Sequence, residues 1–195
     1  MRGFVACVAL CLWTCLLCGL TITVEDYGFA NGKIRNFSEG PWSASGTDLT
    51  EGSGKVWSFA LPTEGYINNS YHNVSNVPGY PAANRSATYS QFLLGYQSTG
   101  TNYYQVTGSD ILSLGYPASP NLVWNPAIPM GLPHYPGKTW HGTHSWQYGT
   151  YTVDGKVISE GQLSTPLGSY PAVCVRYYYQ NNVNNYYFYQ WETRE

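Results

Sequence analysis

The fold of this chain is decided by Tyr170-Pro-Ala-Val-Cys-Val-Arg-Tyr-Tyr-Tyr-Gln180, then Asn181-Asn-Val-Asn-Asn185, then Tyr186-Tyr-Phe-Tyr-Gln-Trp-Glu-Thr193. The first and last runs are rich in valine and aromatic residues, which favour β-strands. The asparagine-rich run between them has the composition of a turn. The stretch therefore predicts a β-hairpin whose strands span residues 170–180 and 186–193.

The residues before this hairpin predict two more strands of the same sheet. A long strand is expected from Lys138 to Val153, a two-residue turn at Asp154-Gly155, and a returning strand from Lys156 to Leu163. Pro166-Leu-Gly-Ser169 then supplies the turn into the hairpin. The C-terminal half is thus predicted to be an antiparallel meander of four consecutive strands.

Strands are also expected nearer the N-terminus. Thr21-Ile-Thr-Val24 and Lys55-Val-Trp-Ser-Phe-Ala-Leu61 both have the composition of strands. In the second of these, Trp57, Phe59 and Leu61 share one face because side chains alternate along a strand. We expect this face to be the buried one.

The middle of the chain predicts shorter strands joined by long connections. Residues 62–88 are rich in turn-forming residues and predict a loop region. Two short strands are expected between Thr88 and Tyr104, around a wide polar hairpin loop at residues 97–102, and another at Ile111 to Leu114. Six prolines between residues 116 and 137 then predict an extended, weakly paired connection.

The predicted fold class is all-β. Helical periodicity is absent between residues 21 and 195, and the 21 glycines and 12 prolines of the chain leave no room for long helices. We expect an antiparallel, strongly curved sheet or a partly open β-barrel or sandwich. The length favours one domain over residues 21–195, with a subdivision at the proline-rich segment 116–137 as the alternative.

The first twenty residues, MRGFVACVALCLWTCLLCGL, have the layout of a secretory signal peptide. Arg2 precedes an apolar run from Phe4 to Leu17 that is too short for a stable membrane span. We therefore expect a secreted, periplasmic or cell-surface protein with no membrane span after signal cleavage. A retained membrane anchor and lipidation at Cys18 are the alternatives.

One cysteine remains after the predicted cleavage, since four of the five lie in the leader. A lone Cys174 closes no disulfide within the chain, so the fold must be held by its core. Its setting in Ala172-Val-Cys-Val-Arg176 predicts a small buried strand residue and not a reactive thiol.

The composition limits the classes of partner. Charged residues make up 10% of the chain, against about a quarter in ordinary globular proteins, and aromatic residues make up 16%. Loss of Arg2 with the leader changes the formal charge from −2 to −3. Because no basic excess remains to bind phosphates, nucleic acid is excluded as a partner. A ligand is expected to be neutral, either a glycan or a lipid-like molecule, and an envelope or surface protein is the other expected partner.

Two parts of the chain resemble known bacterial proteins. Gly54-Lys-Val-Trp-Ser-Phe-Ala-Leu61 is similar to a segment near the start of secreted β-rich proteins that carry type IX secretion sorting tails. Tyr135-Pro-Gly-Lys-Thr-Trp140, Thr165-Pro-Leu-Gly-Ser-Tyr170 and Ala172–Arg176 resemble later motifs of the same proteins, and this half also resembles DUF3108-type periplasmic β proteins. The resemblance implies an open barrel or curved sheet in a bacterial envelope protein, and it carries no catalytic residue.

The histidines do not predict a metal site. His141 and His144 are three residues apart, and on a strand this spacing points them to opposite sides of the sheet. We expect both to lie on the strand surface, and His72 and His134 to be solvated in loops. No metal and no cofactor are predicted.

The acidic residues give weak support to an enzyme. Glu160 and Glu192 fall on neighbouring predicted strands, but a glycosidase needs two converging carboxyls in a cleft. Arg176, on the strand between them, is expected to form a cross-strand ion pair instead. No Gly-x-Ser-x-Gly motif is present either. We therefore predict a non-catalytic protein, with a hydrolase as the least supported alternative.

Aromatic side chains are the clearest functional signal. Tyr187, Tyr189 and Trp191 share one face of the last strand, while Tyr186 and Phe188 share the other. One set of rings is expected to line a core or cavity. The other set either consists of ordinary residues of a half-exposed sheet, which is the favoured interpretation, or offers a flat platform on which a sugar stacks. The predicted ligand-binding residues are Tyr187, Tyr189, Trp191, Trp140 and Trp146. The predicted function is a non-catalytic extracytoplasmic β module, structural or ligand-binding, with adhesion or assembly through edge strands as an alternative.

Overall fold

The computed structural model describes residues 19–27, 34–38, 47–59, 65–72, 85–93, 96–115, 123–146, 149–165 and 168–194. Every named element in these ranges is a β-strand. The strands are β1 (Ile34–Ser38), β2 (Gly52–Ser58), β3 (Gly65–His72), β4 (Arg85–Leu93), β5 (Tyr96–Val106), β6 (Ile111–Gly115), β7 (Val123–Pro129), β8 (Thr139–Trp146), β9 (Gly149–Thr165), β10 (Gly168–Gln180) and β11 (Asn185–Glu192). The all-β fold class is confirmed. The predicted leader, residues 1–20, lies almost wholly outside the described residues.

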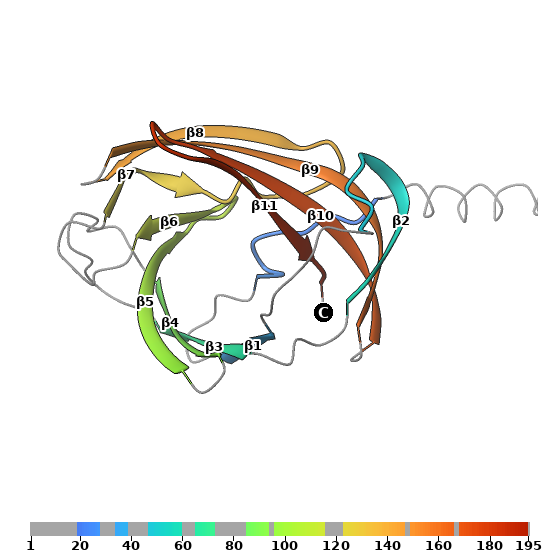
Figure 1. Ribbon diagram of the computed structural model, residues 1–195, viewed down its shortest axis with the longest axis horizontal. Helices are drawn as coiled ribbons and strands as arrows, with labels where there is room; N and C mark the ends of the chain where they lie inside the picture. Colours follow the sequence, from blue (N-terminus) through green and yellow to red (C-terminus); the bar gives the residue numbers. More distant parts are fainter. Residues whose placement is uncertain are drawn as a thin grey trace, which may run out of the picture.

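The strands form one curled sheet, a half-barrel (Figure 1). Ten strands follow the order β1-β3-β4-β5-β6-β7-β8-β9-β10-β11, and each is antiparallel to its neighbour. The prediction of an antiparallel, strongly curved sheet is therefore confirmed. β2 lies off this path and runs parallel to β9. The two ends of β9 have different partners: residues 149–156 pair with β8, and residues 159–164 pair with β2. No helix in the described part of the chain is both long and apolar enough to cross a membrane.

The C-terminal half is the predicted meander of four strands, β8 to β11, but its first turn was misplaced. Asp154-Gly155 lies inside β9, and β8 connects to β9 at residues 147–148. Position 155 needs glycine for a reason unrelated to a turn. A Cβ atom there would lie 2.0 Å from the ring of Trp140, which sits opposite on β8. The Asp-Gly pair thus marks a close packing contact in a strand interior.

Two predictions for the middle of the chain were wrong. Residues 62–88 include β3 and the start of β4, and the predicted loop at 97–102 lies within β5. These segments are polar, but they pair in register along their full length, with Thr88 opposite Thr101 and Ser90 opposite Thr99. Threonine is favoured in strands because its β-branched side chain suits the extended backbone. Polar composition alone therefore did not indicate a loop here.

The proline-rich segment carries β7, which continues the sheet between β6 and β8. Its pairing with β8 has a single register position, Asn125 opposite Ser145. This weak pairing agrees with the predicted extended connection, because prolines donate no ladder hydrogen bonds.

The inner face of the curl carries the larger apolar cluster. Its buried members are Ile22, Tyr27, Ile111, Leu132, Val153, Val157, Val173, Val175 and Tyr177. The first two come from the N-terminal segment, which runs inside the curl in Figure 1. Residues 21–24 do not form the predicted strand. They make an isolated bridge between Ile22 and His134, and then Asp26 closes a turn by accepting hydrogen bonds from the amide and hydroxyl of Thr23.

A smaller apolar cluster lies on the outer face, where β2 meets β9. Its buried members are Trp57, Ile158, Ala172 and Cys174, and Phe59 and Trp191 pack against them. The prediction that Trp57 and Phe59 face a core is confirmed, while Leu61 lies outside the described residues. Burial raises the pKa of the Cys174 thiol to about 12, as expected of a structural cysteine.

Candidate functional site

A hollow of about 560 Å³ lies on the outer face of the meander, away from the inner cluster. Its side chains form two neighbouring cross-strand rows: Thr139, Lys156 and Arg176 in one, and His141, Asp154, Tyr178 and Tyr187 in the other. Because opposite residues of adjacent antiparallel strands share a face, these side chains all point the same way. The register of β8 to β11 therefore builds the hollow.

One wall of the hollow is a histidine–carboxylate pair. His141 Nδ1 lies 2.6 Å from Asp154 Oδ1, and both side chains are about half exposed. The two residues are directly opposite on β8 and β9, so the pair is held by the sheet. It presents fixed hydrogen-bonding groups to a ligand.

The floor of the hollow carries two cations. Lys156 Nζ lies 2.6 Å from both carboxylate oxygens of Glu51, in the residues just before β2. The hydrogen bond from Lys156 lowers the pKa of Glu51, and the charge of Arg176 acts in the same direction. Arg176 lies directly opposite Lys156 on β10. Its guanidinium carbon is 5.7 Å from the centre of the Tyr187 ring.

The second wall is aromatic. Tyr187 is 58% exposed, and its ring centre lies 4.8 Å from that of Tyr178 on the opposite strand. The two rings are tilted by 31°. An exposed ring beside fixed polar groups is the arrangement by which proteins stack sugars and bind their hydroxyls.

The predicted binding residues are distributed over both faces of the sheet. Tyr187 lines the hollow, as predicted. Tyr189 and Trp191 share its face but belong to the outer cluster, where the Trp191 ring lies 4.8 Å from that of Phe59. The side chain of Trp146 lies outside the described residues.

Trp140 points the other way, into the curl. Its ring stacks on His134 with the ring centres 4.8 Å apart, and it fills the space beside Gly131 and Gly155. It packs against the inner cluster, and it is also one of the residues that line the hollow. Its role in the structure is packing.

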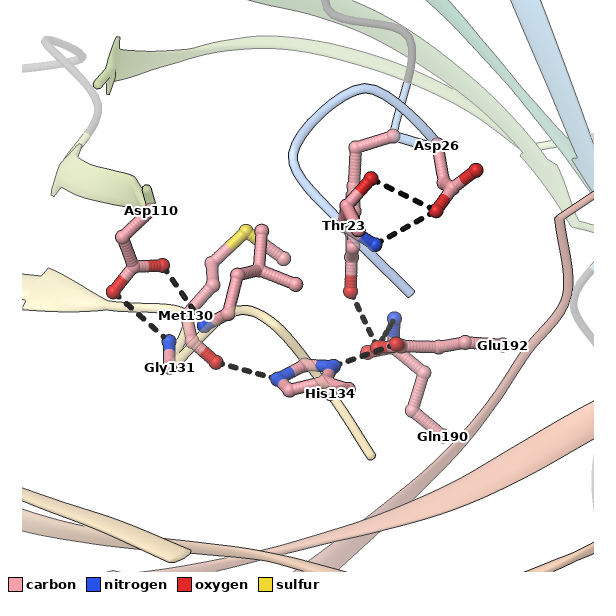
Figure 2. A network of polar contacts seen from close by, with 10 residues as sticks. Thr23, Asp26, Asp110, Met130, Gly131, His134, Gln190 and Glu192 are labelled. Carbon is pink, nitrogen blue, oxygen red and sulfur yellow. Dashed lines mark hydrogen bonds and ion pairs between the residues drawn. The ribbon is translucent and has the colours of Figure 1, made fainter. Parts of the chain in front are cut away.

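A buried polar network lies within the curl (Figure 2), and it contradicts the prediction that His134 is solvated. His134 is 0% exposed, and its Nδ1 lies 2.7 Å from Glu192 Oε2. Its Nε2 lies 2.8 Å from the carbonyl oxygen of Met130. Tyr27 and Gln190 donate further hydrogen bonds to Glu192. The network joins the N-terminal segment, the 130–134 connection and β11.

Both ring nitrogens of His134 face oxygen acceptors, namely a carboxyl and a carbonyl. A carbonyl can only accept, so Nε2 carries a proton. A second proton then lies between Nδ1 and Glu192. Nearby, Asp110 accepts from the amides of Ile111, Gly131 and Leu132, which fixes the same connection. These groups are saturated, and their arrangement is that of a structural clasp.

The predicted ion pair between Arg176 and a neighbouring glutamate is wrong. Glu160 and Glu192 both lie opposite Val173, on the inner face, whereas Arg176 points to the outer face. Glu160 instead accepts a hydrogen bond of 3.2 Å from the amide of Leu20. The two glutamates flank β10 and each has its own partner, so they do not form a converging pair around a cleft.

The two central histidines point to opposite faces, as predicted. His141 is in the hollow, but His144 is only 2% exposed, which corrects its expected surface position. His144 Nδ1 donates to the carbonyl of Pro126 at 2.9 Å. Within the ranges that the structure describes, no three His, Cys, Asp or Glu side chains gather in a way that would hold a metal. The side chain of His72 lies outside the described residues.

Comparisons with family models, curated proteins and solved structures give no match to this chain. The resemblance to sorting-tail and periplasmic β proteins stays a prediction.

Of the residues that line the hollow, Tyr187 and Trp140 were predicted from the sequence and the others were missed. Asp154 was assigned to a turn, and Arg176 to an ion pair on the other face. The signal that would have found them is the register: with Trp146 paired to Gly149, Asp154 lies opposite both His141 and Tyr178.

Proposed function

We propose that this protein is a non-catalytic extracytoplasmic β module that binds a glycan in the hollow on the outer face of β8 to β11. The observation that carries the proposal is the exposed Tyr187 ring beside polar side chains that the sheet holds in place. A sugar ring stacks on the aromatic face, and its hydroxyls meet Asp154, His141 and Lys156. The volume of about 560 Å³ lies within the usual range for small-molecule sites.

The polar groups of the hollow support binding over hydrolysis. The lining contains one carboxylate, Asp154, whose Oδ1 is engaged by His141. Glycosidases use two carboxyls about 5 to 9.5 Å apart across the scissile bond. Glu51, the next carboxylate, is held by Lys156 through both of its oxygens. We therefore infer that Asp154 orients His141 and that Glu51 balances the charge of Lys156.

The inner face gives less support to a lipid-like ligand. Side chains of the N-terminal segment, Ile22 and Tyr27, pack into the curl against β9 and β10. The buried clasp of His134 and Glu192 fills the neighbouring space with hydrogen-bonded groups. The part of the concavity beside β9 and β10 is thus occupied by the protein's own side chains.

Calorimetric titration with oligosaccharides tests the proposal. We expect the purified protein to bind at least one hexose or hexuronate oligosaccharide and Tyr187→Ala to lose that binding. Tyr186→Ala is the matched control, because Tyr186 is similarly exposed (51% against 58%) but lies on the opposite face of β11. Each lost aromatic contact weakens binding by about 0.5 to 1.5 kcal/mol. Absence of binding across the panel, or equal effects of the two variants, would contradict the proposal.

Assembly through a sheet edge is the second candidate. β11 pairs with β10 on one side and ends the strand order, and three of its rings, Tyr186, Tyr187 and Phe188, are about half exposed. This edge carries no charge from Asn185 to Trp191, and uncharged edges pair readily with another chain. Sedimentation velocity over a range of protein concentrations tests it. Concentration-dependent dimers that Phe188→Lys dissolves would support this candidate, and a monomer at every concentration would exclude it.

A further inference from the structure

We infer that the glycan is acidic: a sugar whose carboxylate or sulfate is held by Arg176 while its ring stacks on Tyr187. This inference rests on the proposed function, because it specifies the ligand of the same hollow. It departs from the neutral ligand that the low overall charge predicted. The reason is that the few charges of this chain are not evenly spread over the described surface.

Arg176 and Lys156 are a like-charged pair built into the sheet. They lie directly opposite each other on β10 and β9, and both point to the outer face. Like charges in this position repel and lower the stability of a sheet. The chain has nine lysines and arginines among 195 residues, and two of them placed side by side oppose the stability of the fold.

Glu51 makes direct contact with only one of these two cations. Both of its carboxylate oxygens bind Lys156 Nζ, at 2.6 Å each. None of the carboxylates in the described ranges lies within 4.0 Å of the Arg176 guanidinium, and its five N–H groups have no acceptor among the described residues. Arg176 thus has open hydrogen-bond donors in the floor of the hollow, and the nearby Glu51 interacts with its charge without a direct contact.

The position of Arg176 suits an acid group on a stacked sugar. Its guanidinium lies over the Tyr187 ring, with the guanidinium carbon 5.7 Å from the ring centre, so a pyranose that stacks on the part of the ring left exposed lies beside the guanidinium. A carboxylate or sulfate attached to that pyranose reaches the planar fork of N–H donors. Arginine binds such oxyanions through two parallel hydrogen bonds, which a neutral hydroxyl does not reproduce.

Four oligosaccharides of equal length separate the sources of the acid group. They are a hexuronate oligomer, its methyl ester, the matching neutral hexose oligomer and an O-sulfated hexose oligomer. Each is titrated by calorimetry against the wild-type protein, Arg176→Gln, Tyr187→Ala and Lys138→Gln. The last variant is the charge-matched control, because Lys138 lies outside the hollow with its ammonium over the Tyr135 ring.

We expect the hexuronate or the sulfated oligomer to bind the wild-type protein at least about tenfold more tightly than the neutral oligomers do. The reason is that the neutral oligomers cannot form the charge-assisted bidentate contact with Arg176. Arg176→Gln should remove this preference, Tyr187→Ala should weaken every oligomer, and Lys138→Gln should bind like wild type. Binding of hexuronate but not sulfate identifies a carboxylate site, and the reverse identifies a sulfate site.

The outcomes separate this inference from the proposed function. If neutral and acidic oligomers bind equally, and Arg176→Gln changes nothing while Tyr187→Ala abolishes binding, the acidic ligand is wrong and the glycan site stands. If no oligomer binds, both fail.

A ligand-free measurement adds an independent check. Because Arg176→Gln removes a repulsion, its melting temperature should equal or exceed that of wild type. A lower value would assign Arg176 to the fold and overturn the inference.

Discussion

Trp140 and Gly155 lie opposite each other on β8 and β9, and the indole ring occupies the space in which a side chain at position 155 would begin. A Cβ atom at Gly155 would be 2.0 Å from the ring. The same ring stacks on His134, whose partner Glu192 lies on β11. One close contact between neighbouring strands therefore sets the position of the clasp that ties the last strand to the N-terminal segment.

Gly155→Ala should destabilise the protein, because the methyl group has no room unless Trp140 and His134 move. Overpacking of this kind costs about 1 to 3 kcal/mol. Gly108→Ala is the control, since nothing lies within 4 Å of a Cβ atom at that position. Urea unfolding at equilibrium measures both variants. Equal stability of the two would show that the Trp140 ring can move aside freely.

The two histidine–carboxylate pairs provide a direct test of how burial changes the value of a contact. His134–Glu192 and His141–Asp154 have nearly the same geometry, with Nδ1–O distances of 2.7 and 2.6 Å. The first is buried and the second is about half exposed. Breaking a buried pair costs about 3 to 5 kcal/mol, whereas an exposed pair contributes at most about 1 kcal/mol.

Glu192→Gln should therefore lower the free energy of unfolding by several times more than Asp154→Asn. Both changes keep the shape of the side chain and remove its charge, so cavity effects cancel between them. Chemical denaturation of the two variants under identical conditions provides the comparison. Similar losses would mean that the clasp is more hydrated in solution than its burial indicates.

The residues just compared also show how far sequence reasoning reached. The alternation of side chains along a strand and the turn-forming residues were enough to predict the all-β class, β10 and β11. They also predicted that Tyr187, Tyr189 and Trp191 share one face. The Asp154-Gly155 signal was misleading because glycine serves two needs, turns and close packing, that look the same in a sequence. A displaced turn changes the partner of every residue in the strand, so the rows of the hollow could not be predicted.

The clasp could not be predicted from the sequence, for a different reason. Tyr27, His134 and Glu192 are separated by 165 residues from first to last, and no local pattern links them. Only the closure of the curled sheet brings the three segments together. A histidine between prolines has the sequence context of a solvated loop, and its burial is decided by contacts distant in sequence.

Alkaline pH should unfold the protein through its buried tyrosines. Burial raises the pKa of Tyr179 to about 12, and that of Tyr177 well above its usual value. The folded state thus holds these phenol protons more tightly than the unfolded chain, so the stabilisation is complete below pH about 10 and is lost as the pH rises towards 12. Denaturant unfolding at a series of pH values should show this fall.

Tyr179→Phe should flatten the alkaline fall by about 2 kcal/mol, because the group that ionises on unfolding is gone. Tyr187→Phe is the control, since its ring is exposed. Absorbance at 295 nm should show the tyrosinate signal of Tyr179 rising together with the unfolding transition. A signal from Tyr179 that appears well before unfolding would mean that its hydroxyl has access to solvent.

The Cys174 thiol should be inert until the outer cluster opens. It is fully buried in the outer cluster, and burial raises its pKa to about 12, so thiolate is scarce at pH 8 in the native protein. We expect an aromatic disulfide reagent to leave Cys174 unmodified in buffer and to modify it completely in denaturant, with Cys174→Ala as the blank. Trp57→Ala should raise the native-state rate, because Trp57 packs in the same cluster. Rapid modification of Cys174 in the native wild-type protein would show that β2 detaches readily from β9. Because Glu51 directly precedes β2 and binds Lys156, the floor of the hollow would then be mobile as well.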